Sequence, residues 1–262
     1  MLDAGGNSGE TARIRVARPS HLRVPMNPYH IDFISSYCDR WCERCPLAER
    51  CSAFSVTAAI AMCDGDAGAA FELALGPAPD DDGAAEPRGS WPPALFDAQM
   101  SPEDEAEWMR REEQRSEKVD ASPIMLEAKA VMSAAHQWLT ANADALATGD
   151  EIVREALAVV SHDVALISAK LHRALHGRHC AGGEDAFGDD HPVQNDWNGS
   201  AKVALISIER SVEAWSVLAS ISGQHTPACL AAQLTALRAE VERAFPDAWK
   251  FCRPGFDGHA QP

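Results

Sequence analysis

Helical periodicity in the second half of the chain is the feature that most restricts its fold. Apolar residues recur there at steps of three and four, which places them on one face of each expected helix. Long alternating runs of Val, Ile and Thr, which are typical of strands, are missing. The pattern predicts an all-α fold, a helical bundle of about four long helices. The expected helices run from about Ser122 to Asn142, Asp150 to His176 with Gly177 as its stop, Asp196 to Ile221, and Thr226 to Phe245.

Composition divides the rest of the chain. Residues 64–93 are rich in Gly, Pro, Ala and Asp, as linkers are, and residues 101–120 form a highly charged stretch that we expect to be a helical connector. A cysteine-rich stretch precedes them. The expected parts are a flexible N-terminus (1–26), a Cys-rich metal-binding segment (27–63), an acidic linker or connector (64–120), the helical bundle (121–250) and a C-terminal tail (251–262).

Charge restricts the partners. The chain has 23 Lys and Arg against 39 Asp and Glu, a net charge of −16. Such a chain repels phosphates, so we expect no nucleic acid and no anionic membrane as partner, whereas a redox protein or a basic protein would suit it. The N-terminal residues lack the apolar stretch of a secretory signal, and no stretch approaches the roughly 18 apolar residues of a spanning helix. We therefore expect a cytoplasmic protein with reduced thiols.

The Cys-rich segment contains the clearest chemical pattern. Four of the eight cysteines fall within 14 residues, spaced C-x3-C-x2-C-x5-C, with arginines between them. Four thiolates close to one point repel one another, so they need a metal ion or a cluster to hold them together. Polar neighbours argue against four cysteines that merely fill a core. The predicted ligands are Cys38, Cys42, Cys45 and Cys51.

The spacing favours an iron–sulfur cluster over zinc. Structural zinc sites usually join two short Cys or His knuckles from separate segments. Here one continuous segment supplies all four thiols, with a single C-x2-C and a Cys45-Pro46 pair of the kind found in iron–sulfur loops. The expected cofactor is a [4Fe-4S] cluster, with zinc as the alternative.

Part of this segment resembles a known cluster loop. The run CERCPLAERC is similar to the second half of the [4Fe-4S] loop of adenine DNA glycosylases in the endonuclease III superfamily, through Cys42, Cys45, Pro46, Leu47 and Cys51. The resemblance implies a [4Fe-4S] cluster on these cysteines. It does not extend to the helix-hairpin-helix motif or the catalytic aspartate of that family, so it does not imply glycosylase activity.

A second resemblance concerns the first three cysteines. Cys38, Cys42 and Cys45 have the C-x3-C-x2-C spacing of radical-SAM enzymes, in which the cluster leaves one iron open. Those enzymes resemble TIM-type barrels of alternating strands and helices, whereas this sequence indicates helices and offers Cys51 as a fourth ligand.

Two charged residues interrupt the apolar face of the second expected helix. Asp163 and Lys170 are seven residues apart, so they share a face two turns apart. Buried charges need partners, which here indicates either an internal salt bridge or a functional pocket between bundle helices, and the pocket would make the chain an enzyme. The residues that could meet them across the bundle are Asp196, Asn198, Lys202 and Glu209.

The end of the same helix offers a further cluster. Its spacing, H-x3-H-x2-H-C, fits a second metal site, or else exposed histidines that the helix dipole favours. The residues are His172, His176, His179 and Cys180. The pattern assigns no role to Cys63, Cys229 or Cys252. The sequence thus predicts an iron–sulfur protein with a redox or stapling role, with a zinc-stapled interaction protein and an enzyme as alternatives.

Overall fold

The computed structural model describes residues 29–76, 101–147, 149–181 and 191–258. Within these ranges it contains helices and 3-10 turns and no strand, so the predicted all-α class is confirmed. None of these helices is long and apolar enough to cross a membrane. The α-helices are α1 (Ser52–Met62), α2 (Ala67–Leu75), α4 (Pro102–Asp120), α5 (Pro123–Ala147), α6 (Glu151–Ala181), α7 (Asp196–Ser222) and α8 (His225–Ala244). The 3-10 turns are η1 (Ile34–Ser36), η2 (Cys42–Arg44), η3 (Ala48–Arg50) and η4 (Ala248–Lys250).

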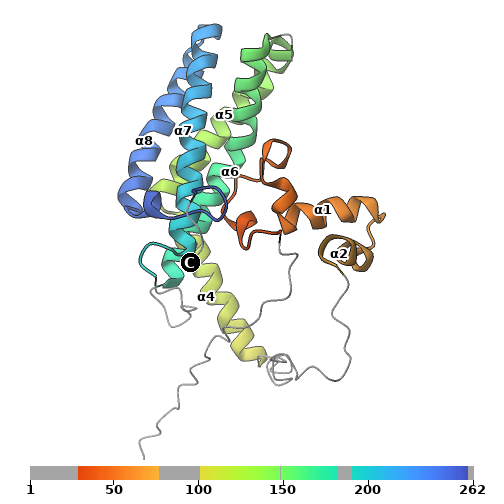
Figure 1. Cartoon of the computed structure of the whole chain (residues 1–262). Coiled ribbons are helices and arrows are strands. Elements are labelled where there is room, and N and C mark those ends of the chain that lie inside the picture. The colour runs from red at the N-terminus through yellow and green to blue at the C-terminus, as the bar shows by residue number, and fades with distance from the viewer. Residues whose placement is uncertain (1–28, 77–100, 148, 182–190, 259–262) are drawn as a thin grey trace, which may run out of the picture.

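Helices α5 to α8 pack side by side around one apolar core (Figure 1). α5 contacts α6 and α8, and α7 contacts the same two helices, so the four close into a ring. The core is filled at one end by Trp138 and Trp215, whose rings meet edge to face at 5.3 Å. Further along, Leu205, Leu234 and Leu237 are almost completely buried. The apolar faces that the sequence indicated are the faces that the ring buries.

Gly177 does not end its helix, contrary to the prediction. α6 continues to Ala181, and Gly177 does not have the positive φ that a C-terminal stop uses. A Cβ atom at Gly177 would lie 3.6 Å from Cβ of Trp197, at the start of α7. The small residue therefore lies where α6 passes close to the beginning of α7.

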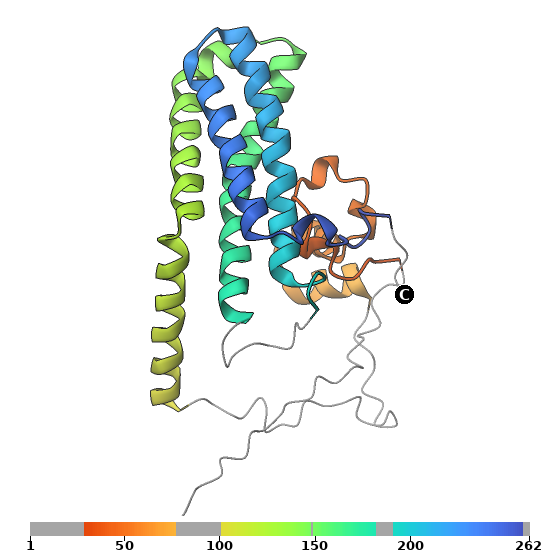
Figure 2. The same ribbon diagram turned by 90° about the vertical axis from the view of Figure 1, so that its left-hand side faces the viewer.

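The predicted linker contains helices. Residues 64–76 include α2, which packs against α1 as a hairpin to one side of the bundle (Figure 1). The charged connector is α4, which packs against α6 and extends the line of α5 away from the bundle (Figure 2). The rest of the linker, residues 77–93, and the predicted flexible N-terminus, residues 1–26, lie outside the described residues.

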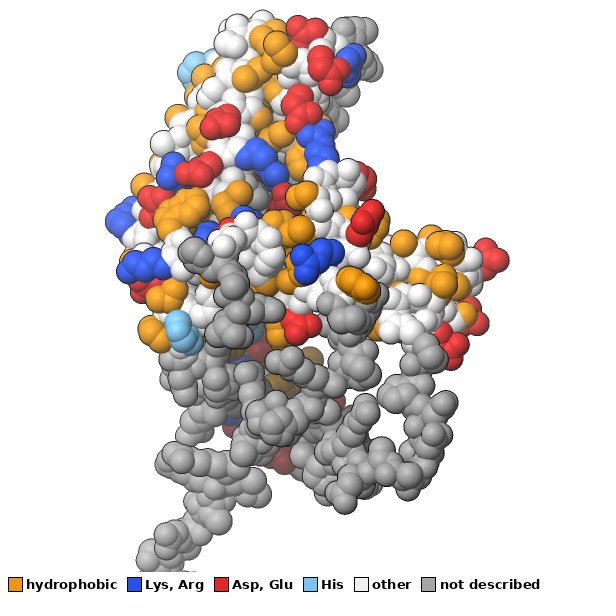
Figure 3. Space-filling view, viewed as in Figure 1, with side chains coloured by type: hydrophobic (Ala, Val, Ile, Leu, Met, Phe, Trp, Pro, Cys, Tyr) orange, Lys and Arg blue, Asp and Glu red, His pale blue; other side chains and the backbone are white. Residues whose placement is uncertain are grey.

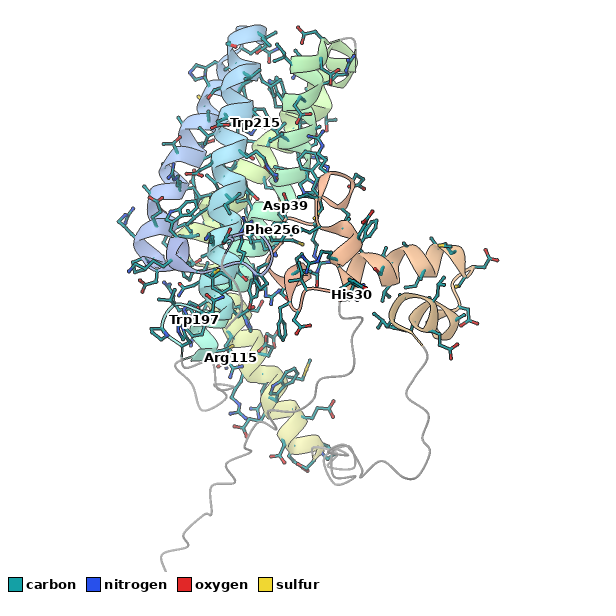
Figure 4. All side chains as sticks on the ribbon, in the orientation of Figure 1. His30, Asp39, Arg115, Trp197, Trp215 and Phe256 are labelled. Atoms are coloured by element: carbon teal, nitrogen blue, oxygen red, sulfur yellow. The ribbon has the colours of Figure 1, made fainter. Side chains whose placement is uncertain are left out.

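The cysteine segment lies on the flank of the bundle, against α6 and α7 (Figure 4). A close contact at Gly199 of α7 fixes its position: a Cβ atom there would lie 2.5 Å from the ring of Tyr37 and 2.7 Å from Phe251. The residues that follow η4 return to the same place. Phe251 is only 2% exposed and its ring lies 4.7 Å from that of Tyr37, so the part of the predicted C-terminal tail that the structure describes is packed into the fold.

Candidate metal centre

The four predicted cysteine ligands line one small cavity. Short turns place them there: the backbone N–H of Cys45 bonds to the carbonyl of Cys42, and that of Cys51 bonds to the carbonyl of Ala48. Cys38 lies in the loop that precedes η2. All eight cysteines of the chain are free thiols. The cavity is completed by Ile34, Asp39, Arg40, Trp41, Ala48, Phe54 and Phe256.

Without a bound group, this cavity disfavours thiolates. Burial raises the pKa of the Cys38 thiol, although a hydrogen bond from the backbone N–H of Arg40 opposes the shift. Burial also raises the pKa of Cys42, and the like charges of Cys38, Cys51 and Cys45 add to this. A positively charged metal centre would reverse the effect.

The donor set suits an iron–sulfur cluster. Clusters of this kind take four thiolates in an apolar lining, with backbone N–H groups bonded to the sulfurs. Here Arg40, which has a φ of 59°, presents its N–H to Cys38, and Ile34, Phe54 and Phe256 supply apolar surface. Within the described ranges, no group of three or more His, Cys, Asp or Glu side chains is gathered around one ion position.

An ion-pair chain joins this loop to the bundle. Asp163 of α6 is completely buried and accepts two hydrogen bonds from the guanidinium of Arg210 on α7, at 2.5 and 2.9 Å. The same guanidinium donates to Oδ2 of Asp39 in the cysteine loop, at 2.8 Å. Although burial opposes it, the bond from Arg210 lowers the pKa of Asp39. Asp163 therefore acts through Arg210, a partner that the sequence pattern did not suggest.

Lys170 lies two turns after Asp163 on α6 and contacts the same loop. It is 6% exposed, and its Nζ donates to the carbonyl oxygen of Ser36 at 3.0 Å. Burial lowers the pKa of Lys170 to about 8, with the charge of Cys38 opposing the shift. The two buried charges that interrupt the apolar face of α6 therefore support the cysteine loop, and each has its own partner.

Aromatic stacking adds to the contact between the cysteine loop and α6. The indole of Trp41 lies flat on the imidazole of His162, with ring centroids 4.4 Å apart. The same histidine also contacts the backbone of the loop, because its Nε2 lies 2.9 Å from the carbonyl oxygen of Asp39. Arg44 covers the indole at 3.9 Å and forms an ion pair with Glu155 of α6. The loop is thus held by polar and stacking contacts on the side of the bundle.

Asp163 meets α7 through Arg210 and Ser211, whereas the four residues of α7 that the sequence suggested have partners of their own. Asp196 bonds to Arg173 and to Tyr37, Asn198 to the carbonyls of Pro192 and Val193, Lys202 to Phe251 and Asp257, and Glu209 to Arg238. A cavity among the bundle helices, next to Trp215 and Leu237, has a volume of only about 10 Å³, which is barely enough for one water molecule. The bundle therefore offers no substrate-sized pocket there.

The predicted histidine site is divided between separate partners. Nε2 of His176 lies 2.6 Å from Glu112 of α4, and Nε2 of His172 lies 3.8 Å from Asp120. Cys180 has its sulfur 3.6 Å from Nδ1 of His176. His179 joins none of these contacts in the part of the chain that the structure describes. These side chains connect α6 to α4.

Sequence reasoning missed the C-terminal contribution to the centre. Phe256 lines the cysteine cavity, although it lies 205 positions after Cys51 in the chain. The only sequence signal for this role is that Phe256 is a large apolar residue among polar residues and glycines near the end of the chain. That signal is weak. No known protein-family model, curated protein or solved structure matches this chain.

Proposed function

We propose that this chain is an iron–sulfur protein that exchanges electrons with a protein partner in the cytoplasm. Cys38, Cys42, Cys45 and Cys51 would hold a [4Fe-4S] cluster. One observation carries the proposal: the four cysteines of a single 14-residue stretch line one cavity, with apolar side chains around it. When bound there, the cluster would supply reversible one-electron transfer.

The position of the cavity suits exchange of electrons with a partner. It lies in a loop on the flank of the bundle, and Cys42 and Cys45 are only partly buried. The loop is rigidly supported by Asp39 and Lys170, which would hold the ligands in place as an electron is gained or lost. Free thiols throughout the chain accord with a reducing compartment.

The cluster would also staple its own segment. Between residues 29 and 63, only Ile34, Cys51 and Ala59 are buried, so little apolar surface stabilises this part of the chain. Segments with so small a core usually depend on a metal or a disulfide. The bundle, by contrast, has a filled core and no pocket for a substrate beside Trp215, which is why we do not propose an enzyme.

Metal analysis of anaerobically purified protein tests the proposal. We expect a brown protein with about four irons and four sulfides per chain, with broad visible absorption that bleaches on reduction. Replacing any one of the four ligands by Ser should remove most of the iron. Cys229→Ser is the matched control, because Cys229 lies on α8 and does not line the cavity; it should keep the full iron content.

Two results would change the assignment. A colourless protein with one zinc per chain would contradict the cluster and favour a zinc-stapled interaction protein on the same ligands. Full iron content in Cys51→Ser would contradict the four-ligand site and favour three ligands with one open iron. The radical-SAM spacing of the first three cysteines would then become the better guide.

A further inference from the structure

We propose that the C-terminal segment Phe251–Asp257 is the cover of the metal centre, with Phe256 as the residue that shields it from solvent. This inference rests on the proposed function for its redox consequence. The segment follows the bundle in the chain and returns to the cysteine loop, where Phe256 lies beside Asp39 (Figure 4). The segment contains Cys252 and Asp257, but neither lines the cavity, so we take its contribution to be the exclusion of water and oxidants.

The cover is anchored to the bundle by a buried lysine. Nζ of Lys202 on α7 donates to the carbonyl of Phe251 at 2.6 Å and to Oδ2 of Asp257 at 2.7 Å, so one ammonium group fastens both ends of the segment. Asp257 also accepts from the backbone N–H and the guanidinium of Arg253. These bonds lower the pKa of Asp257 to about 2, although burial opposes the shift.

The middle of the cover lies directly on the cysteine segment. At Gly255, where φ is +79°, a Cβ atom would lie 2.8 Å from Ile31, 3.1 Å from Leu47 and 3.4 Å from Ile34. Contacts this close leave no room for a side chain. Only glycine combines the positive φ with this approach, and the turn that it makes places the next residue, Phe256, over the cavity.

Phe256 separates the cavity from a wider opening. A groove of about 180 Å³ lies next to the cysteine cavity, and Asp39, Trp41, Cys45 and Phe256 line both. The rest of its walls are mixed: they contain the charged residues Arg44, Glu155 and Arg210 and the apolar residues Pro46 and Val159. Of the four ligands, Cys45 alone also lines the groove, so we place the Phe256 ring between the groove and the other three thiols.

Removing this ring should connect the groove with the cavity. Water would then stabilise the reduced cluster more than the oxidised one, because a cluster with four thiolates carries more negative charge after it gains an electron. The reduction potential should rise. Oxygen would reach the cluster through the same opening, and the cluster should decay faster in air.

The test compares three variants of the full chain with the wild type. Phe256→Ala removes the ring, Phe256→Leu keeps apolar bulk, and Phe71→Ala removes an exposed ring on α2 as a matched control. In protein purified without oxygen, Phe256→Ala should keep its iron but lose the cluster in air about tenfold faster, with a higher potential. Phe256→Leu should restore most of the wild-type lifetime and potential. Phe71→Ala should resemble the wild type.

A second measurement does not depend on the redox state of the cluster. In the metal-bound chain, the rate at which a chelator removes the metal should rise about tenfold in Phe256→Ala, while Phe71→Ala keeps the wild-type rate. Unchanged lifetime, potential and chelation rate in Phe256→Ala would overturn the cover. A wild-type protein without iron would overturn the proposed function instead. The chelation rate of the metal that it holds, or alkylation of Cys38 and Cys51 by iodoacetamide where it holds none, would then still decide whether the segment covers the thiols.

Discussion

The bundle and the cysteine segment are stabilised by different means. The bundle buries long rows of apolar side chains from α5 to α8, and each helix is held by two others. The cysteine segment buries few residues of its own and is fastened by Asp39, Trp41 and Arg44 to partners on α6 and α7. The surface shows the same contrast: side chains of mixed character cover the bundle, whereas apolar ones gather over α1 and α2 (Figure 3).

The difference means that one region can lose its structure without the other. The bundle has an apolar core of its own, and burial of that core does not involve the cysteines. The segment relies on polar and aromatic contacts at the flank, including Trp41, which packs against the edge of that core, and on whatever group its thiols bind. Local stabilities within a protein follow such differences in buried apolar contact. The experiments below test how far this independence goes.

Removal of the metal should have the largest effect. The energy of metal binding acts where the ligands are, so metal-free protein should lose hydrogen-exchange protection over about residues 27–63 while α5 to α8 keep theirs. Exchange followed by mass spectrometry on metal-bound and metal-stripped chain measures this. Equal loss of protection along α5 to α8 would contradict the independence of the two regions and would mean that the centre supports the bundle core.

Truncation of a buried bundle side chain should destabilise the bundle and leave the cysteine segment unchanged. Leu237 of α8 is completely buried, so Leu237→Ala should lower the free energy of unfolding of the bundle by about 3 kcal/mol. Leu126→Ala removes an exposed leucine of α5 and should cost at most about 0.5 kcal/mol. Denaturant unfolding gives both values, and iron content should stay at the wild-type level in both variants. Loss of iron in Leu237→Ala alone would show that the regions are coupled.

The sequence was sufficient for the bundle because helical periodicity is a local property. Steps of three and four residues define an apolar face, and α5, α7 and α8 begin within a few residues of their predicted starts. The prediction failed at Gly177, because a glycine can serve either as a helix stop or as a point of close approach. Only the packing of α7 on α6 decides between these roles.

The sequence was sufficient to pick out four cysteines that share one cavity, but not to predict the residues around them. The spacing of four cysteines within one segment is itself local, and the structure brings all four to one cavity. The support from Arg210 and the cover by Phe256 depend on how distant parts of the chain fold back on the loop. Asp163 and Lys170 stood out as buried charges, yet nothing in their spacing shows that they would reach the loop.

Removing the ion pair between Asp39 and Arg210 should lower the stability of the cysteine segment and leave that of the bundle unchanged. Asp39→Asn removes the charge that Arg210 contacts from the loop side, while Asp163 keeps its own two bonds. A charge-assisted hydrogen bond at a partly exposed site contributes about 1 kcal/mol, so protection of the segment should fall about fivefold. Glu43→Gln removes an exposed carboxylate from the same segment and is the matched control. A fall in bundle protection of the same size would mean that Asp39 also stabilises the bundle.

The smallest effect that we expect is a pH-dependent change in the stability of the cover, Phe251–Asp257. This segment lies over the cysteine segment and is anchored to the bundle. The folded pKa of Asp257 is about 2, below the value of about 3.9 in unfolded chain, so the charged carboxylate stabilises the anchor above about pH 4. That contribution should be lost as the pH falls from about 4 to about 2, when the carboxylate becomes protonated. Carbon-13 NMR of the Asp257 carboxyl in metal-free chain follows the titration directly. Since the anchor is Lys202 of α7, the midpoint should stay near 2 even after the cysteine segment has lost its metal. A midpoint near 4 in metal-free protein would show that the cover is held by the cysteine segment rather than by the bundle, and the two regions would then be linked through the C-terminus.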